Sequence, residues 1–190
     1  MSKVNEEKIL QRPTYTLNST VVLAYSGLLT AVSILLACIY PIPLFTDFLL
    51  YEPSDVPIIL GGIFLGLGPG LLITTVTSII MAIITGHGGP IGIVMHIIST
   101  GILVSMITIF YRKGDSKGRY LMGAIIGVLG TTVAMVLWNL ILTPLYIGVP
   151  RSVVVGLLWP AIIPFNLVKT SINSALAYGL LKLISPHFKR

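Results

Sequence analysis

Near its C-terminus the chain reads Trp159-Pro-Ala-Ile-Ile-Pro-Phe-Asn-Leu-Val-Lys-Thr-Ser-Ile-Asn173, a stretch of polar side chains inside a long apolar segment. Asn166, Lys169, Thr170 and Asn173 follow the spacing i, i+3, i+4, i+7, which places them on one face of an α-helix. A lysine inside such a segment costs about 2.5–3.5 kcal/mol on the membrane-insertion scale. It therefore needs a carboxylate, a water-filled cavity or a ligand, and we favour a ligand.

Working outward from this segment, the composition of the whole chain predicts a membrane protein. Of its 190 residues, 55% are apolar and only 9% are charged, and the mean hydropathy is +0.97. Soluble domains carry about 25% charged residues, so this chain is not expected to be one. The single cysteine, Cys38, excludes an internal disulfide. We interpret the net charge of +6 as a topology signal, and we expect contact with membrane lipid rather than with nucleic acid.

Six apolar segments, separated by proline- and glycine-rich breaks, predict an all-α membrane protein with six transmembrane helices. The second segment starts after the helix-start signal Ser54-Asp55-Val56-Pro57 and is short, because Gly68-Pro69-Gly70 ends it. Pro160 and Pro164 predict a short separate helix at the start of the last span. The expected spans are 19–40, 56–67, 69–85, 91–111, 120–142 and a last one that follows the loop 143–151 and ends near 184.

The distribution of basic residues predicts the orientation of these spans. Six spans bring both termini to one side, and if that side is cytoplasmic it holds ten of the twelve lysines and arginines. Arg151 is the one basic residue left in an outer loop, and Lys169 lies within the last span. The positive-inside rule therefore predicts cytoplasmic N- and C-termini. We treat residues 1–190 as one transmembrane substrate-binding domain, in which residues 1–18 are a cytoplasmic N-terminal segment.

In this topology, polar side chains from three helices converge in the outer half of the membrane. Asn166 and Lys169 follow the outer start of the last span, Asn139 precedes the outer end of the fifth, and His96 follows the outer start of the fourth. Above them we expect the loop 41–53, which is too polar to lie in lipid and yet rich in aromatic residues. The pattern predicts a cavity open to the exterior and covered by a lid. The expected substrate-binding residues are Asn166, Lys169, Asn139, Phe45, Asp47, His96, Tyr40 and Asn173.

Plainer interpretations of these residues stay open at this point. The amides and His96 could form interhelical hydrogen bonds, and Lys169 could pair with Asp47 or Asp55. Metal binding is not expected, because no second histidine, cysteine or carboxylate stands at ligand spacing from His96. The glycine-rich run 66–70 lacks the lysine and hydroxyl residue of a phosphate-binding loop, so active transport would need a partner that supplies energy.

Small residues in the first span point to helix–helix contact. Gly27 and Ala31 form a small-xxx-small pair, which lets another helix approach closely. The pair would serve either packing within the bundle or docking of another membrane protein.

Taken together, the chain resembles the substrate-binding S components of energy-coupling factor (ECF) vitamin transporters, and more narrowly the riboflavin-specific ones. The resemblance covers nearly the whole chain. It rests on the six spans, the long first outer loop and three local matches: the segment 54–57 leading to Gly68-Pro69-Gly70, Asn139 followed by Pro144-Leu145-Tyr146, and Pro164-Phe165-Asn166-Leu167-Val168-Lys169. It implies that Asn166 and Lys169 contact the flavin ring. Gly27 and Ala31 stand where the family carries an Ala-xxx-Ala motif for docking on the transmembrane coupling subunit.

The resemblance further implies a transport mechanism in the plasma membrane of a bacterium. The S component captures the vitamin from outside, associates with a module of one coupling subunit and two ATPases, and topples to release the vitamin inward. No cofactor and no enzymatic step is expected on this chain. The alternatives are the same family with folate, pantothenate, thiamine or pyridoxine, an intramembrane protease of the rhomboid type, and a structural subunit without a ligand.

Overall fold

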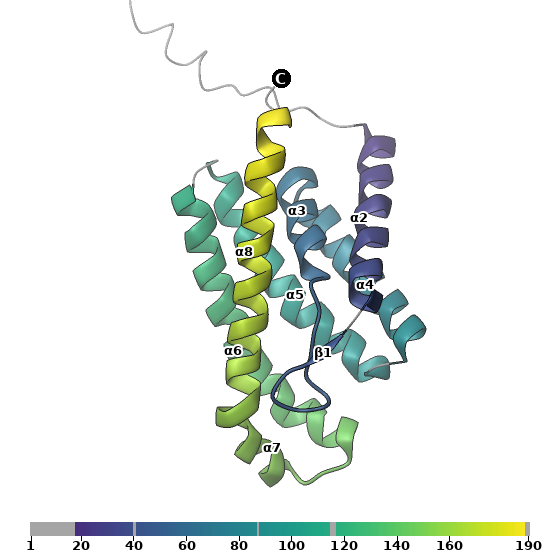
Figure 1. The fold of residues 1–190 in the computed structure, drawn as a ribbon, viewed down its shortest axis with the longest axis vertical. Helices are drawn as coiled ribbons and strands as arrows, with labels where there is room; N and C mark the ends of the chain where they lie inside the picture. Colours follow the sequence, from purple (N-terminus) through teal and green to yellow (C-terminus); the bar gives the residue numbers. More distant parts are fainter. Residues whose placement is uncertain (1–17, 40, 87, 115–116, 189–190) are drawn as a thin grey trace, which may run out of the picture.

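The computed structural model describes residues 18–39, 41–86, 88–114 and 117–188, and the predicted N-terminal segment lies, but for Asn18, outside them. Figure 1 shows an upright bundle in which the start of the first described helix and the end of the last lie at the same end. The elements are α2 (Ser19–Ile39), β1 (Ile42–Pro43), β2 (Leu50–Tyr51), α3 (Asp55–Leu65), α4 (Leu67–Thr85), α5 (Gly89–Arg112), α6 (Lys117–Ile147), α7 (Arg151–Leu157), the π-helical turn η1 (Leu158–Ile162) and α8 (Ile163–Phe188).

Within the described residues, five helical segments are long and apolar enough to cross a membrane: α2, α4, α5, α6 and the continuous run from α7 through η1 to α8. The predicted second span is present as α3, but its 11 residues extend only about 16 Å at 1.5 Å per residue. A hydrocarbon core is about 30 Å thick, so α3 crosses roughly half of it. The predicted all-helical membrane fold is confirmed, with a second helix even shorter than the sequence indicated.

Helix α3 is surrounded by other helices, which explains why it is apolar on all sides. Every residue from Asp55 to Ile63 is buried, and Ile58 and Ile59 are fully inaccessible. It packs against α2, α4, α5 and α8. A helix that is apolar all round belongs in a core rather than at a surface. Because α3 begins inside the bundle, the residues that precede it enter the bundle as well.

The expected outer loop 41–53 forms a small antiparallel hairpin. Ile42 pairs with Tyr51 and Pro43 with Leu50. Leu49 of the hairpin packs into an apolar cluster with Val154, Ile162 and Phe165 of α7, η1 and α8. The hairpin is therefore anchored on the last helical segment, and it delivers Glu52 and Asp55 to the interior.

One predicted boundary was wrong. The fifth span was expected to end at residue 142, with a loop from 143 to 151, but α6 continues to Ile147 with Pro144 inside it. A proline one turn from a helix end removes a single backbone hydrogen bond, which is tolerated there more easily than in mid-helix. The helix ends at Gly148, which has a φ of +68° and whose N–H donates to the Pro144 carbonyl. Asn139 and Thr143 are therefore on one continuous helix.

The prolines in the last span act in part as predicted: a π-helical turn marks off the short helix α7, but the helical run continues through that turn into α8. Pro160 lies in the π-helical turn η1 and Pro164 in the first turn of α8. A wide turn accommodates a proline because the missing N–H and the ring no longer disturb an α-helical hydrogen bond. The turn precedes Asn166 and Lys169 and so fixes the angle at which they enter the bundle.

Candidate functional site

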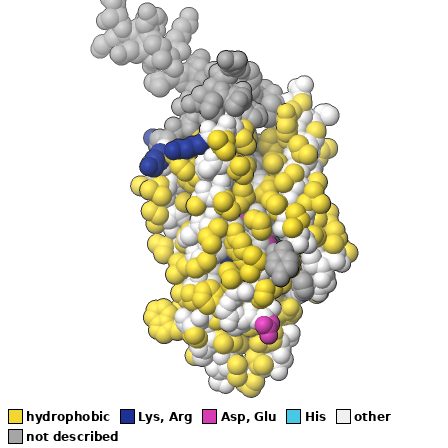
Figure 2. All heavy atoms as spheres, in the orientation of Figure 1, with side chains coloured by type: hydrophobic (Ala, Val, Ile, Leu, Met, Phe, Trp, Pro, Cys, Tyr) yellow, Lys and Arg dark blue, Asp and Glu magenta, His cyan; other side chains and the backbone are white. Residues whose placement is uncertain are grey.

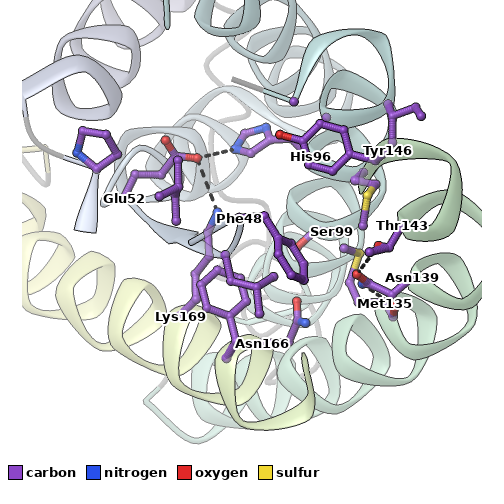
Figure 3. Close-up of a pocket in the computed structure, with 18 of the residues that line it drawn as sticks. Phe48, Glu52, His96, Ser99, Met135, Asn139, Thr143, Tyr146, Asn166 and Lys169 are labelled. Atoms are coloured by element: carbon purple, nitrogen blue, oxygen red, sulfur yellow. Dashed lines mark hydrogen bonds and ion pairs between the residues drawn. The ribbon is translucent and has the colours of Figure 1, made fainter. Parts of the chain in front are cut away.

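A cavity of about 230 Å³ lies between the hairpin and helices α4, α5, α6 and α8 (Figure 3). Five of the eight predicted substrate-binding residues line it: Asp47, His96, Asn139, Asn166 and Lys169. They come from the hairpin and from three different helices, so the predicted convergence is observed. The other polar and aromatic residues of its wall are Phe48, Glu52, Thr85, Ser99, Thr143, Tyr146 and Phe165.

Lys169 is buried in the cavity wall, with 7% of its surface exposed. Its Nζ lies 3.5 Å from the Glu52 Oε1 atom. The sequence offered Asp47 or Asp55 as the carboxylate partner, whereas the structure places Glu52 in contact. Glu52 follows β2 and is only 8% exposed, because the hairpin turns its side chain inward. The buried ammonium is therefore held by a residue of the lid.

Asp55 is a second buried carboxylate, and it is held by three neighbours. Its Oδ1 accepts a hydrogen bond of 2.7 Å from Thr100, and its Oδ2 accepts one of 2.9 Å from the Asn173 amide. The His96 Nε2 atom lies 3.4 Å from the same Oδ1. These contacts tie the start of α3 to α5 and α8, so Asp55 serves to join helices at the base of the site.

The hydrogen bonds of His96 indicate which of its nitrogens carry hydrogen. The Ser78 hydroxyl donates to the Thr74 carbonyl at 2.6 Å, so it accepts from the His96 Nδ1, 2.7 Å away. The Nε2 atom faces carboxylate oxygens of Asp55 and Glu52, at 3.4 and 3.9 Å, and only a donor is stable there. His96 therefore links Ser78 of α4 to the carboxylates of Asp55 and Glu52.

Ser78, His96 and Asp55 follow one another in the order of a protease triad, but their arrangement does not suit catalysis. Ser78 is fully buried and lies outside the lining of the cavity. Its only hydroxyl hydrogen goes to Thr74, so the imidazole does not accept it as a general base would. The geometry gives no support to the rival interpretation of an intramembrane protease.

Two of the three predicted asparagines, Asn139 and Asn166, line the cavity and differ in their freedom to bind a ligand. Asn139 donates from its Nδ2 to the Met135 carbonyl and accepts at Oδ1 from Thr143, each at 2.7 Å. Asn166 donates to the Ile162 carbonyl at 2.8 Å. That bond uses one amide hydrogen and leaves the Asn166 carbonyl oxygen and second hydrogen for a ligand. Asn166 therefore offers an acceptor and a donor side by side, about one helical turn from Lys169.

Two predicted residues, Phe45 and Asn173, do not line the cavity. Phe45 is 54% exposed, because its φ of +69° turns the chain there. Phe48, in the same loop, lines the cavity instead. Asn173 is fully buried below the cavity, where it bonds Asp55 and the Glu52 carbonyl. Tyr40 lies outside the described residues.

Tyr51 connects the hairpin to the buried cluster from outside the helices. Its hydroxyl donates to the Asn173 Oδ1 at 3.2 Å. Burial, together with the negative charge of Asp55, raises the pKa of this hydroxyl above its ordinary value near 10, against the opposing effect of Lys169. The phenol therefore stays protonated and remains a donor at neutral pH.

Sequence reasoning missed Glu52, Ser99 and Thr143 as cavity residues. Glu52 had one available signal, since an acidic residue three positions before Asp55 and directly before Pro53 stands next to a helix start. Ser99 and Thr143 gave none, because single hydroxyl residues occur throughout these apolar spans. Thr143 was also assigned to a loop, which hid its position one turn after Asn139.

Gly27 and Ala31 lie on the outer face of α2. Both are exposed, and a Cβ atom built on Gly27 meets nothing within 4 Å. The buried face of the helix is formed instead by Ser26, Thr30 and Ser33. The small pair therefore does not pack within this bundle, which removes one of the two interpretations of it.

Comparison with known proteins places this architecture in a family. A family model described as "ECF transporter, substrate-specific component" matches residues 21–181. The riboflavin transporter RibU of Streptococcus thermophilus is 30% identical over 184 residues, 90% of this chain and 87% of the relative. RibU of Lactococcus lactis subsp. cremoris is 30% identical over 126 residues, 63% of this chain and 61% of the relative.

A solved structure of the S component of a bacterial ECF transporter has the same fold. It superimposes with a TM-score of 0.76 at 24% identity, and covers 89% of this chain and 98% of that one. With the five apolar spans, the match makes this chain a multi-pass protein of the cell membrane. The family model covers every residue that lines the cavity, and the chain belongs to the family of substrate-specific components of ECF transporters.

Proposed function

We propose that this protein is the riboflavin-binding S component of an ECF-type importer. It captures the vitamin from outside the cell in the cavity beneath the hairpin and delivers it inward with a coupling module. The N- and C-termini are cytoplasmic, in accord with the distribution of lysine and arginine. The names of the two relatives support the choice of riboflavin. No enzymatic step and no resident cofactor is assigned to this chain.

The observation that carries the proposal is the placement of Asn166 and Lys169 on one wall of the cavity. Asn166 presents a donor next to an acceptor, and the imide edge of a flavin ring carries the complementary pair. The Lys169 ammonium suits a ring carbonyl or nitrogen. Apolar and aromatic walls, Phe48 and Phe165 among them, would cover the faces of a planar heterocycle.

The size of the cavity supports a lid that moves. Small-molecule sites usually enclose about 300–1,000 Å³, and this one encloses about 230 Å³ because Phe48 and Glu52 of the hairpin reach into it. A ligand that takes the place of these side chains would also take over Lys169 from Glu52. We therefore infer that the hairpin moves when the vitamin enters.

Gly27 and Ala31 form the docking face for the transmembrane coupling subunit. Both are exposed on α2. Gly27 has no side chain and has open space around it, which allows a partner helix to approach closely. Two ATPase subunits attached to that coupling subunit supply the energy, since the glycine-rich run 66–70 has no phosphate-binding lysine.

The test is the visible absorption spectrum of the purified, detergent-solubilised protein, followed by titration with riboflavin. We expect a flavin spectrum, and quenching of Trp138 and Trp159 fluorescence when riboflavin is added to stripped protein. The variants Asn166→Ala and Lys169→Ala are expected to carry less flavin, whereas Gly179→Leu, on the lipid-facing side of α8, is expected to carry as much as the parent. A colourless protein that does not respond to riboflavin, but does to folate, pantothenate, thiamine or pyridoxine, would replace the vitamin and keep the site.

A further inference from the structure

A groove of about 430 Å³ lies between α6 and α8 on the outer surface of the bundle. Its α6 wall is formed by the exposed apolar residues Leu121, Ile125 and Leu129, and its α8 wall includes Ala175 and Tyr178. It shares no lining residue with the riboflavin cavity. The groove therefore needs an explanation of its own.

The groove exists because α8 carries small residues where it faces α6. Ser171 and Ala175 are one turn apart and exposed, and they leave the α8 wall recessed. The floor is Tyr120, which is 3% exposed and whose hydroxyl donates to the Ser174 carbonyl at 2.7 Å. Since the floor already satisfies its own polar groups, the groove suits an apolar occupant.

One end of the groove is positively charged. Lys117 lines it at the start of α6, and the Lys182 ammonium lies 5.1 Å from the ring centroid of Tyr178, which is part of the α8 wall. Figure 2 shows lysine and arginine side chains at the upper left of this face and a largely hydrophobic surface below them. Within the described ranges, the carboxylates Asp47, Glu52 and Asp55 lie at the hairpin and the buried cluster instead.

The length of the groove matches one leaflet. From Leu121 to Leu129 the helix rises about 12 Å, and half of a hydrocarbon core is about 15 Å. Lysines at the charged end would lie at the level of the lipid headgroups, where each attracts an anionic lipid. We propose that this groove binds an acidic phospholipid, with an acyl chain between α6 and α8 and its phosphate at Lys117 and Lys182. The site goes beyond vitamin binding and does not depend on which vitamin is carried.

The experiment measures lipid adducts on the full, detergent-purified chain by native mass spectrometry. Phosphatidylglycerol and phosphatidylcholine with the same acyl chains are titrated in turn. We expect one phosphatidylglycerol molecule to bind tightly and phosphatidylcholine to bind more weakly. Ala175→Trp fills the groove and is expected to abolish that adduct. Lys117→Gln and Lys182→Gln are each expected to weaken the binding of phosphatidylglycerol about fivefold and to leave the binding of phosphatidylcholine unchanged. A fivefold loss corresponds to roughly 1 kcal/mol, the contribution of one basic residue near a lipid surface.

Two controls separate this site from general contact with lipid. Ala24→Trp adds the same bulk to an exposed position of α2, and Arg151→Gln removes a charge at the start of α7; both are expected to keep the adduct. Equal binding of the two lipids by the parent chain, or an adduct that survives both Ala175→Trp and the lysine variants, would overturn the proposal. If Ala175→Trp keeps the lipid adduct but no longer co-purifies with the coupling subunit, the groove would be assigned to a protein partner instead.

Discussion

The Lys169 Nζ atom on α8 lies 3.5 Å from the Glu52 Oε1 atom at the end of the hairpin, so the cation expected to meet the ligand is paired with a residue of the lid. An unpaired buried ammonium is costly, and the lid carboxylate removes that cost. A ligand that accepts from Lys169 would compete with Glu52 for it. This competition couples binding at the cavity to the position of the hairpin.

The first prediction concerns Glu52→Gln, which keeps the shape of the side chain and removes its charge. We expect the thermal midpoint of the empty protein to fall by several degrees, because Lys169 loses its ion-pair partner in the wall of the cavity. The increase in midpoint on adding saturating riboflavin should be larger than in the parent, because the bound state does not use the lost pair. The measurement is thermal unfolding in detergent, with and without riboflavin.

The matched control is Asp47→Asn, which neutralises another hairpin carboxylate in the same cavity wall. It is expected to change the empty midpoint less than Glu52→Gln does. A smaller ligand-induced shift in Glu52→Gln than in the parent would mean that Glu52 itself contacts the vitamin.

The second prediction concerns the binding wall. Asn166→Ala and Lys169→Ala should each weaken riboflavin binding by about 1.5–3 kcal/mol, the scale of a hydrogen bond to a charged group or of a buried polar partner left unpaired. Fluorescence titration of the purified protein measures the dissociation constants. Unchanged affinity in both variants would rule out this assignment of the site.

The third prediction distinguishes Asn173 from Asn166, two asparagines on the same face of α8. Asn173 donates to Asp55 and to the Glu52 carbonyl and does not line the cavity. Asn173→Ala should therefore destabilise the empty protein by about 1–3 kcal/mol, because it leaves the buried Asp55 carboxylate with one donor fewer. Riboflavin affinity should change much less than in Asn166→Ala. Equal losses of affinity in the two variants would place Asn173 in the binding site after all.

Much of this arrangement could be predicted from the sequence because membrane insertion makes buried polar residues conspicuous. Lys169, Asn166, Asn139 and His96 stand out against apolar helices, and the order of the spans brings them to one region. The partner of Lys169 could not be chosen in this way. Three carboxylates lie close together in the sequence at 47, 52 and 55, and only the turns of the hairpin decide which of them contacts Lys169.

Phe45 illustrates the same limit. Phe45 and Phe48 are equivalent as aromatic residues of a loop, and a left-handed φ at the first sends it outward while the second enters the cavity. Helix periodicity also placed Asn173 on the face of Asn166 and Lys169 correctly. Periodicity could not show how deep in the bundle each of these residues lies. That depth places Asn173 at the carboxylate cluster beneath the cavity, and it depends on how far α3 extends into the bundle.

The fourth prediction tests the docking face. Gly27→Leu and Ala31→Leu should leave riboflavin binding intact and abolish uptake in cells that hold the coupling module, because a leucine on the exposed face of α2 blocks close approach of a partner helix. Binding is measured on purified protein and uptake with labelled riboflavin. Gly179→Leu is the control, since Gly179 is also a helical glycine with open space around it. Normal uptake in both α2 variants would count against docking at this face.

The last prediction concerns the contact that holds the half-length helix α3 against α4. A Cβ atom on Gly70 would lie 2.8 Å from the Gly62 Cα atom, and a backbone atom cannot move aside as a flexible side chain can. Gly70→Ala should therefore destabilise the protein by about 1–3 kcal/mol, the usual cost of overpacking a tight core. Gly68→Ala, two residues earlier on the same helix, meets nothing within 4 Å and should be neutral or slightly stabilising. Thermal unfolding of both variants in detergent measures the difference. Equal stability of the two variants would show that α3 and α4 adjust to the added methyl group without cost.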